Sequence, residues 1–228
     1  MLKFLSFGSG SSGNCYILFT GADCLMIDCG VGIRTLKKHF YNYGLQMSMI
    51  HHILITHDHA DHVKSVGSIS GDLQLPVYAT DGTLQGIRNN WCVRRKIDTK
   101  LTHTINKGEE ILLGEFKVVA FDVPHDSTDC VGYSIEHDGV RFTLVTDCGH
   151  ITEDIAHYIS ISNYLVIEAN HEPEKLAAGP YPRHLKERIS GPNGHLSNEA
   201  CALALVQNAS PLLRHVWLCH LSDENNHP

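Results

Sequence analysis

Apolar and polar residues alternate along much of the chain with the two-residue period of β-strands. In the first half this pattern predicts strands over 2–7, 15–19 and 24–27 and near 77–79. The apolar run Ile53-Leu54-Ile55 predicts a further, buried strand. Helical spacing of apolar residues predicts helices over 33–43, where Gly44 is a typical stop, and over 61–70 and about 81–90.

From Lys107 onward the pattern predicts successive strands over 110–113, 116–123, 131–137 and 140–146, and Asp138-Gly139 is a strong hairpin signal. After Asp147 it predicts a helix near 152–159, a strand at 164–168, helices near 182–190 and 197–208, and a strand at 215–219. No linker rich in Pro, Gly or Ser divides the halves. We therefore expect one α/β domain over residues 1–228, with two sheets packed face to face and helices outside.

Four side chains that can bind metal follow the strand Ile53–Ile55, in the order His57, His59, Asp61 and His62. The first two are two residues apart, so they point the same way in an extended segment. The other two come where the chain is expected to turn into a helix. A metal-free polar loop does not require the spacing H-x-H-x-D-H beside a buried strand, so the motif predicts a site for two adjacent metal ions.

Three later residues also end apolar strands and are candidates for the same site: His125, Asp147 and His220. Each alone is typical of an ordinary loop. Together with the first motif they become predicted ligands, because a metal needs side chains that converge from several elements. A carboxylate shared between two ions is a common bridge, and Asp147 is the candidate for it.

Composition restricts the class of protein. The chain has 17 histidines, eight cysteines without a C-x-x-C pair, and no run of about 18 apolar residues that would suggest a membrane span. The N-terminus lacks the apolar core of a signal peptide. We expect reduced thiols in a cytoplasmic protein.

The formal net charge of −7 argues against indiscriminate nucleic-acid binding. Two basic groups are local exceptions. The first surrounds Trp91, and the second lies between residues 175 and 188; their members are Arg88, Arg94, Arg95, Lys96 and Lys100, and Lys175, Arg183, Lys186 and Arg188. Each group is either a contact surface for a polynucleotide or a solvated face.

Several polar residues are predicted to support the site. The loop Gly8–Asn14 consists of small residues and contains Ser11 and Asn14, which could contact substrate or lie in a tight turn beside the metals. Asp28 ends a strand and is expected to orient a histidine rather than bind metal. His195 follows a Gly/Pro-rich loop before the N-cap candidate Ser197, so it either serves the reaction or only the capping turn.

The chain resembles the metallo-β-lactamase superfamily, and within it the bacterial YycJ/WalJ family. The motifs that carry this resemblance are the metal-binding segment, Gly8–Asn14, Glu168–Glu172, Gly194–Asn198 and His220–Asn226. The resemblance implies a four-layer αβ/βα sandwich of two mixed β-sheets with helices outside. Members of this family usually continue past the last motif, so we expect their C-terminal tail to be missing after Pro228.

The resemblance also implies roles for individual residues. His57, His59 and His125 resemble the ligands of one metal, Asp61, His62 and His220 those of a second, and Asp147 the bridge. His195 resembles a catalytic histidine, and His171 either steadies it or lines the substrate site. Zn²⁺ or Mn²⁺ suits these ligands, with iron as a third candidate.

The expected function is hydrolysis of phosphodiester bonds by a metal-activated hydroxide that Asp61 orients, with DNA as substrate, as in the family's 5′–3′ double-stranded DNA exonucleases. One alternative is hydrolysis of a small cyclic phosphodiester, lactone or thioester by the same ions. Another is a non-catalytic module, which a set of seven ligands disfavours because structural zinc sites use four.

Overall fold

A computed structural model describes residues 1–227 and divides them into two compact units. The first comprises Met1–Phe116 and Ser127–Asp129, and the second comprises Lys117–Asp126 and the chain from Cys130 onward. The expectation of a single domain over residues 1–228 stays a prediction. None of the described helices combines the length and apolar character needed to cross a bilayer.

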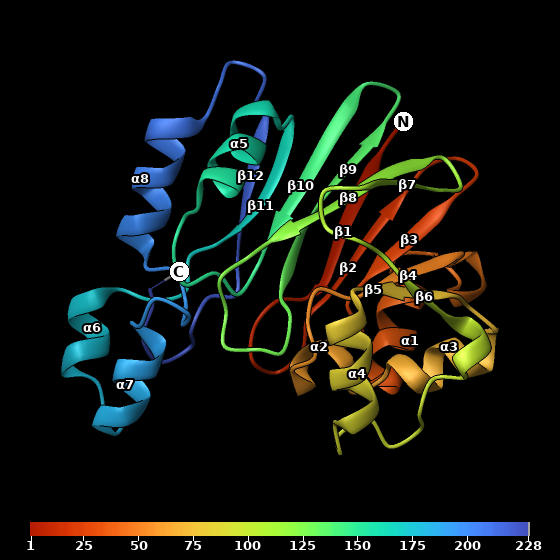
Figure 1. The fold of residues 1–228 in the computed structure, drawn as a ribbon, viewed down its shortest axis with the longest axis horizontal. Coiled ribbons are helices and arrows are strands. Elements are labelled where there is room, and N and C mark those ends of the chain that lie inside the picture. Colours follow the sequence, from red (N-terminus) through yellow and green to blue (C-terminus); the bar gives the residue numbers. More distant parts are fainter. Residues whose placement is uncertain (228) are drawn as a thin grey trace. The chain divides into compact units, whose positions relative to one another are not determined.

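The first unit contains a mixed sheet in the order β1-β2-β3-β4-β5-β6, antiparallel from β1 to β3 and parallel from β3 to β6 (Figure 1). Its strands are β1 (Lys3–Gly8), β2 (Cys15–Phe19), β3 (Cys24–Ile27), β4 (His52–Leu54), β5 (Val77–Ala79) and β6 (Thr102–Thr104), and β7 (Glu110–Leu113) follows in the chain. Its helices are α1 (Ile33–Asn42), α2 (Ala60–Val63), α3 (Val66–Leu73) and α4 (Asp81–Asn89), with 3-10 turns η1 (Met47–Met49) and η2 (Thr99–Leu101).

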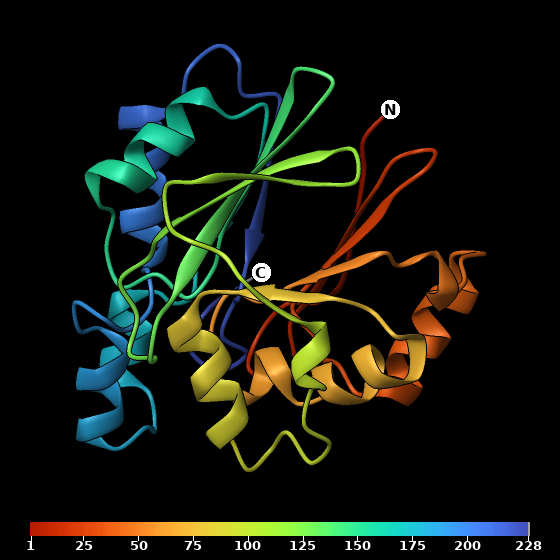
Figure 2. The same ribbon diagram turned by 45° about the vertical axis from the view of Figure 1, so that its right-hand side comes forward.

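Helices α1, α3 and α4 cover one face of this sheet (Figures 1 and 2). Apolar residues on one side of each helix are buried against the strands, among them Leu36 of α1, Ile69 of α3 and Ile87 of α4. Burial of such side chains contributes about 1.5–3 kcal/mol each, so the strand ends rest on a rigid base.

The second unit contains five strands of a second mixed sheet, in the order β12-β11-β10-β9-β8. The pairs β8–β9 and β9–β10 are antiparallel, and β10–β11 and β11–β12 are parallel. The strands are β8 (Phe116–Asp122), β9 (Val131–His137), β10 (Val140–Val145), β11 (Tyr164–Glu168) and β12 (His215–Cys219). The helices are α5 (Glu153–Ile161), α6 (Pro173–Ala178), α7 (Arg183–Ile189) and α8 (Asn198–Asn208).

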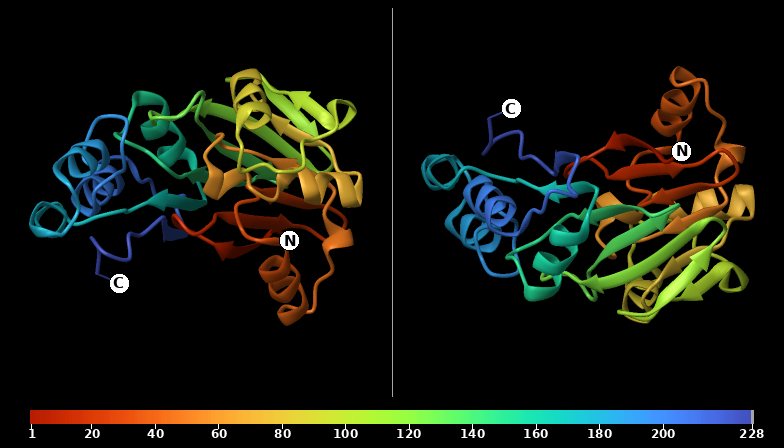
Figure 3. Two further views of the ribbon diagram at one scale, coloured as in Figure 1. Left: turned by 90° about the horizontal axis from the view of Figure 1, so that it is seen from below. Right: turned by 90° about the horizontal axis from the view of Figure 1, so that it is seen from above.

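Helices α5 and α8 lie side by side on one face of the second sheet (Figures 1 and 3). Ile155 and Ile159 of α5 and Cys201 of α8 are buried with residues of β10 and β11. The shorter α6 and α7 contact each other through the Lys186 ammonium, which donates to the Ala177 carbonyl at 2.6 Å. None of the eight cysteines forms a disulfide, as expected for reduced thiols.

Most predicted elements are confirmed to within two residues, but the helix predicted over 61–70 is wrong: it is divided into α2 and α3. The cause is tertiary. The Ser65 hydroxyl donates to the Val31 carbonyl at 2.8 Å and its N–H to the Cys29 carbonyl at 3.0 Å, which turns the chain. The short elements β6 and α6 were not predicted, because three- and six-residue segments carry too little periodicity.

Candidate metal centre

The predicted site residues follow the carboxyl ends of parallel strands in both sheets. In the first unit Asp28 follows β3 and the His57 segment follows β4; in the second, Asp147 follows β10 and His220 follows β12. Parallel strands present their carboxyl ends at one edge of a sheet, where ligands of open α/β sheets usually bind. Asp28, Asp147 and His220 all have positive φ values, of 61°, 52° and 53°. Such strain in residues other than glycine is concentrated at functional sites.

The structure brings the four residues of the H-x-H-x-D-H motif together in the first unit. The ring centroid of His57 lies 4.8 Å from that of His59 and 4.0 Å from that of His62. His57 and His62 are fully buried, whereas the Asp61 side chain is 23% exposed. Three imidazoles and a carboxylate therefore meet at the end of β4.

Asp28 orients two of these histidines, as predicted for a positioning residue. Its Oδ2 accepts from His62 Nδ1 at 2.8 Å, and it also accepts the Thr56 hydroxyl proton at 2.9 Å. Because that hydroxyl has given its proton to Asp28, it accepts from His57 Nδ1 at 3.0 Å. With Nδ1 donating in this way, Nε2 is the nitrogen of His57 and His62 that can carry a lone pair for a metal.

The loop of small residues between β1 and β2 is fastened to the metal-binding segment. The Asn14 backbone N–H donates to the Asp61 carbonyl at 2.8 Å, and its side-chain amide donates to His62 Nε2 at 2.8 Å and to Asp61 Oδ2 at 3.3 Å. Ser11 is exposed and hydrogen-bonds to no described residue. This loop supports the metal-binding segment through Asn14.

In the second unit a buried carboxylate, Asp147, is surrounded by histidines. Its Oδ1 lies 3.4 Å from Nε2 of His220 and 3.8 Å from Nε2 of His125. His125 donates from Nδ1 to the Gly194 carbonyl at 3.0 Å, and His220 donates from Nδ1 to Glu168 Oε1 at 2.9 Å. Each ring therefore presents a Nε2 lone pair toward the carboxylate, which fits the ligand set of Zn²⁺.

Glu168 at the end of β11 is a functional residue that the sequence reasoning missed. Its carboxylate is fully buried and accepts four hydrogen bonds: Oε1 from Nδ1 of His195 (2.8 Å) and His220 (2.9 Å), and Oε2 from the backbone N–H of Cys148 (2.7 Å) and Leu196 (3.0 Å). The apolar strand ending in an acidic residue was the available signal. With its lone pairs used in this way, Glu168 positions histidines rather than binding metal.

This arrangement sets the charge state of the pair Glu168–His195. Burial alone would raise the pKa of Glu168, but His195 and His220 together hold that pKa below its ordinary value. Burial would likewise lower the pKa of His195, yet the Glu168 carboxylate outweighs it and raises that pKa. Glu168, and not His171, accepts the hydrogen bond from His195. His171 is buried, and burial lowers its pKa.

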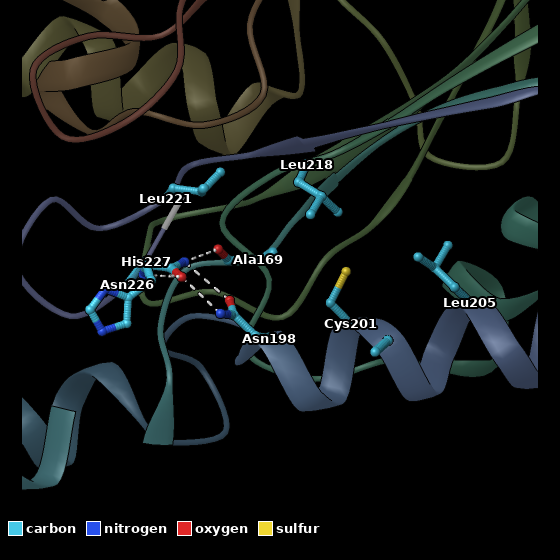
Figure 4. A pocket seen from close by; sticks show the side chains of 9 residues that line it. Ala169, Asn198, Cys201, Leu205, Leu218, Leu221, Asn226 and His227 are labelled. Atoms are coloured by element: carbon cyan, nitrogen blue, oxygen red, sulfur yellow. Dashed lines mark hydrogen bonds between the residues drawn. The ribbon is translucent and has the colours of Figure 1, made fainter. Parts of the chain in front are cut away.

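Three of the motifs that carry the family resemblance lie next to one another in the second unit (Figure 4). They are Glu168–Glu172, Gly194–Asn198 and His220–Asn226. The Asn226 side chain donates to the Ala169 carbonyl at 2.7 Å and accepts from the Asn198 amide at 2.8 Å, beside a cavity of about 250 Å³ between α8 and β12. The Asn170 amide donates to the His220 carbonyl at 2.7 Å. The segment after His220 thus holds the Glu168 and His195 segments in place. These asparagines were not among the predicted site residues.

The two basic groups differ in how far their charges are engaged. In the second, Arg188 pairs with Asp126, Arg183 with Glu187, and Lys175 and Lys186 donate to backbone carbonyls. In the first, Arg95 pairs with Asp72, but Arg94 and Lys100 form no ion pair with any described residue. The second group is therefore mainly structural, and the first retains charge for a partner.

Replacement of Glu168 by glutamine is expected to lower the free energy of unfolding by about 1–3 kcal/mol, because the amide nitrogen cannot accept from the donors that face it. Urea denaturation in the presence of a chelator measures this effect without metal. Glu136→Gln is the matched control: this half-buried glutamate of β9 pairs with Arg141, and we expect a change of about 0.5 kcal/mol or less. Equal stability of Glu168→Gln and the unmodified protein would contradict the role of Glu168.

Comparison with known proteins agrees with this geometry. The profile of the β-lactamase superfamily domain matches residues 24–220. Exodeoxyribonuclease YycJ of Bacillus anthracis is 31% identical over 225 residues, which are 99% of this chain and 84% of that protein. Exodeoxyribonuclease WalJ of Streptococcus pneumoniae is 32% identical over 98% of this chain and 83% of its own length.

Among solved structures, Zn(2+)-bound PqqB from Methylobacterium extorquens matches with a TM-score of 0.78 over 99% of this chain and 90% of that one. At 18% identity this likeness shows the fold alone. It confirms the predicted fold class, two mixed β-sheets with flanking helices. The chain therefore belongs to the metallo-β-lactamase superfamily of metal-dependent hydrolases and stands close to YycJ and WalJ.

Proposed function

We propose that the protein is a nuclease that hydrolyses phosphodiester bonds of double-stranded DNA from a 5′ strand end. The observation that carries this proposal is the 31–32% identity to two exodeoxyribonucleases, over alignments that cover nearly the whole chain and therefore most of each unit. The proposed substrate class is supported by the basic charges near Trp91 that have no acidic partner.

We propose that the metal ligands are the residues assigned through the resemblance: His57, His59, Asp61, His62, His125, Asp147 and His220. Support comes from each unit taken by itself, since hydrogen bonds at Nδ1 leave Nε2 as the nitrogen of His57, His125 and His220 that can bind a metal. His62 is likewise held at Nδ1, and a metal at its Nε2 would take the place of the hydrogen bond from the Asn14 amide. When bound, Zn²⁺ or Mn²⁺ supplies Lewis acidity, which lowers the pKa of water and neutralises charge on a phosphate.

The protein's own residues then have distinct roles. The Asp61 carboxylate, partly exposed and held by Asn14, orients the attacking water. His195 has its Nδ1 on Glu168, so Nε2 is the atom that can give a proton to the departing oxygen. Glu168 holds the ring in that tautomer, as a carboxylate commonly does for a catalytic histidine.

An assay of the metal-loaded protein on end-labelled substrates tests the proposal. The panel contains duplex DNA with a 5′ or a 3′ label, single-stranded DNA, RNA, a cyclic dinucleotide and a lactone. Release of mononucleotides from the 5′ ends of duplex DNA is the expected result. Hydrolysis of only the cyclic dinucleotide or the lactone would replace the proposal by the small-substrate alternative.

Binding of DNA is expected to weaken with added salt, because each phosphate contact contributes about −0.9 to the slope of log K against log salt. Two or three contacts give a slope of about −2 to −3, and the double variant Arg94→Ala/Lys100→Ala should have a slope about 2 closer to zero. The slope is measured by titrating the protein with DNA at four salt concentrations, in the presence of a chelator. Arg183→Ala, which removes an internally paired cation, should leave the slope unchanged.

A further inference from the structure

Trp91 is unusual because 86% of its surface is exposed although the residues on both sides of it are held by hydrogen bonds or burial. It lies in the turn after α4. The Asn90 side chain donates to the Asp58 carbonyl at 2.7 Å and accepts from the Cys92 N–H at 2.9 Å. The Lys96 ammonium donates to the Asn90 carbonyl at 2.7 Å, and Val93 is buried. The indole is therefore exposed to solvent on a well-ordered turn. Packing in the core cannot be the reason for a tryptophan at this position.

The indole borders a hollow of about 580 Å³, within the size range of ligand pockets. One wall is the metal-binding segment, with Asp58 and His59, and the other is the end of α4, with Gln85 and Asn89. The two walls are in close contact at Gly86, where an added Cβ would lie 2.0 Å from a carboxylate oxygen of Asp58. The hollow is therefore built onto the segment that supplies a proposed metal ligand, His59.

The chemistry of the hollow fits a nucleobase. A flat indole offers a stacking surface to any base, and the amides of Gln85 and Asn89 can donate to and accept from a base edge. The Asp58 carboxylate accepts hydrogen bonds from the Thr128 hydroxyl at 2.8 Å and the Thr128 N–H at 3.3 Å, which fix its position in the wall. Exposed Arg88 and Arg94 add positive charge on either side of Trp91.

We propose that Trp91 stacks on the base of the nucleotide next to the scissile phosphate, after that base has left the duplex. This inference rests on the proposed nuclease function and specifies its substrate: a strand end with an unpaired terminal base. A base inside a duplex is stacked on both faces, and the terminal base of a paired end still has its Watson–Crick edge occupied by the opposite strand. Only an unpaired base can both stack on Trp91 and offer that edge to Gln85 and Asn89. The enzyme should therefore prefer frayed or single-stranded ends to blunt, GC-rich ends.

Fluorescence provides a test that does not depend on activity. The chain has two tryptophans, so Trp217→Phe leaves Trp91 as the only one. With a chelator present to prevent cleavage, an oligonucleotide with a frayed end is expected to quench the emission of Trp91. The same oligonucleotide with an abasic terminal residue should bind about 5- to 150-fold more weakly and quench little, as expected for loss of one stacked base.

Trp91→Ala completes the comparison. It should weaken binding of the normal end by the same factor and show no further loss with the abasic end, because both changes remove one contact. Tyr41→Ala, which removes an aromatic side chain of α1 that is 83% exposed, should change neither value. The stacking role would be overturned if Trp91→Ala bound the normal end tightly. It would also be overturned if Trp91→Ala and the abasic end each weakened binding independently, so that their factors multiplied. Either result would leave the proposed nuclease function standing. If the unmodified protein binds and cleaves no polynucleotide, the proposed function itself fails.

Discussion

Replacement of Asp147 by alanine is expected to reduce bound metal from about two ions per chain to one or fewer and to abolish hydrolysis. The buried carboxylate lies 3.4 Å from Nε2 of His220 and 3.8 Å from Nε2 of His125. Without this carboxylate, the two histidines have no negatively charged partner with which to bind a cation. Elemental analysis of the purified variant, together with the duplex cleavage assay, measures both effects.

Asp138→Ala is a matched control because the backbone φ of Asp138, 51°, is nearly that of Asp147, 52°. It lies in the exposed turn between β9 and β10. Alanine in the left-handed region costs on the order of 1 kcal/mol at either position, so the two variants share the backbone effect. Asp147→Asn removes the charge but tolerates this conformation. Unchanged metal content in both Asp147 variants would refute the bridging assignment.

The sequence was sufficient to predict that the candidate site residues follow strand ends, because the physical rule involved is local. A short apolar run followed by polar, metal-binding residues places those residues at a strand end, as for Ile53–Ile55 and His57. The positions of Asp147 and His220 followed from the same rule. That each unit gathers its own candidates at one sheet edge is a consequence of parallel pairing, which the alternation of helices and strands also predicts.

The role of Glu168 could not be predicted, because it depends on four donors from distant parts of the chain. His195 is 27 residues away and His220 is 52, and no local pattern indicates that both direct Nδ1 at one carboxylate. The division of the helix after Val63 has a similar cause, a hydrogen bond from Ser65 to Val31 across 34 residues. For the same reason the sequence could not show that the second basic group is paired within the protein. Arg188, for example, pairs with Asp126, which is 62 residues away.

His195→Ala is expected to lower kcat by about 10²- to 10⁴-fold while metal content and melting temperature remain near those of the unmodified protein. The structure gives the reason: Nδ1 of His195 is hydrogen-bonded to Glu168 at 2.8 Å, and it is Nδ1 that lies nearer the Asp147 carboxylate, at 3.8 Å. The nitrogen that faces Asp147 is thus already engaged by Glu168, and the ring is suited to proton transfer from Nε2. Single-turnover kinetics on duplex DNA measure the loss.

A substrate with a good leaving group distinguishes proton transfer from phosphate binding. A nitrophenyl phosphodiester releases an oxygen that needs no proton, so the loss caused by His195→Ala should shrink on it. His150→Ala is the control, since this exposed loop histidine donates only to the Pro192 carbonyl and should lose activity on neither substrate. Equal losses on both substrates would mean that His195 positions the phosphate. Loss of metal in the variant would instead make His195 a ligand and require one of the seven assigned residues to be removed from the set.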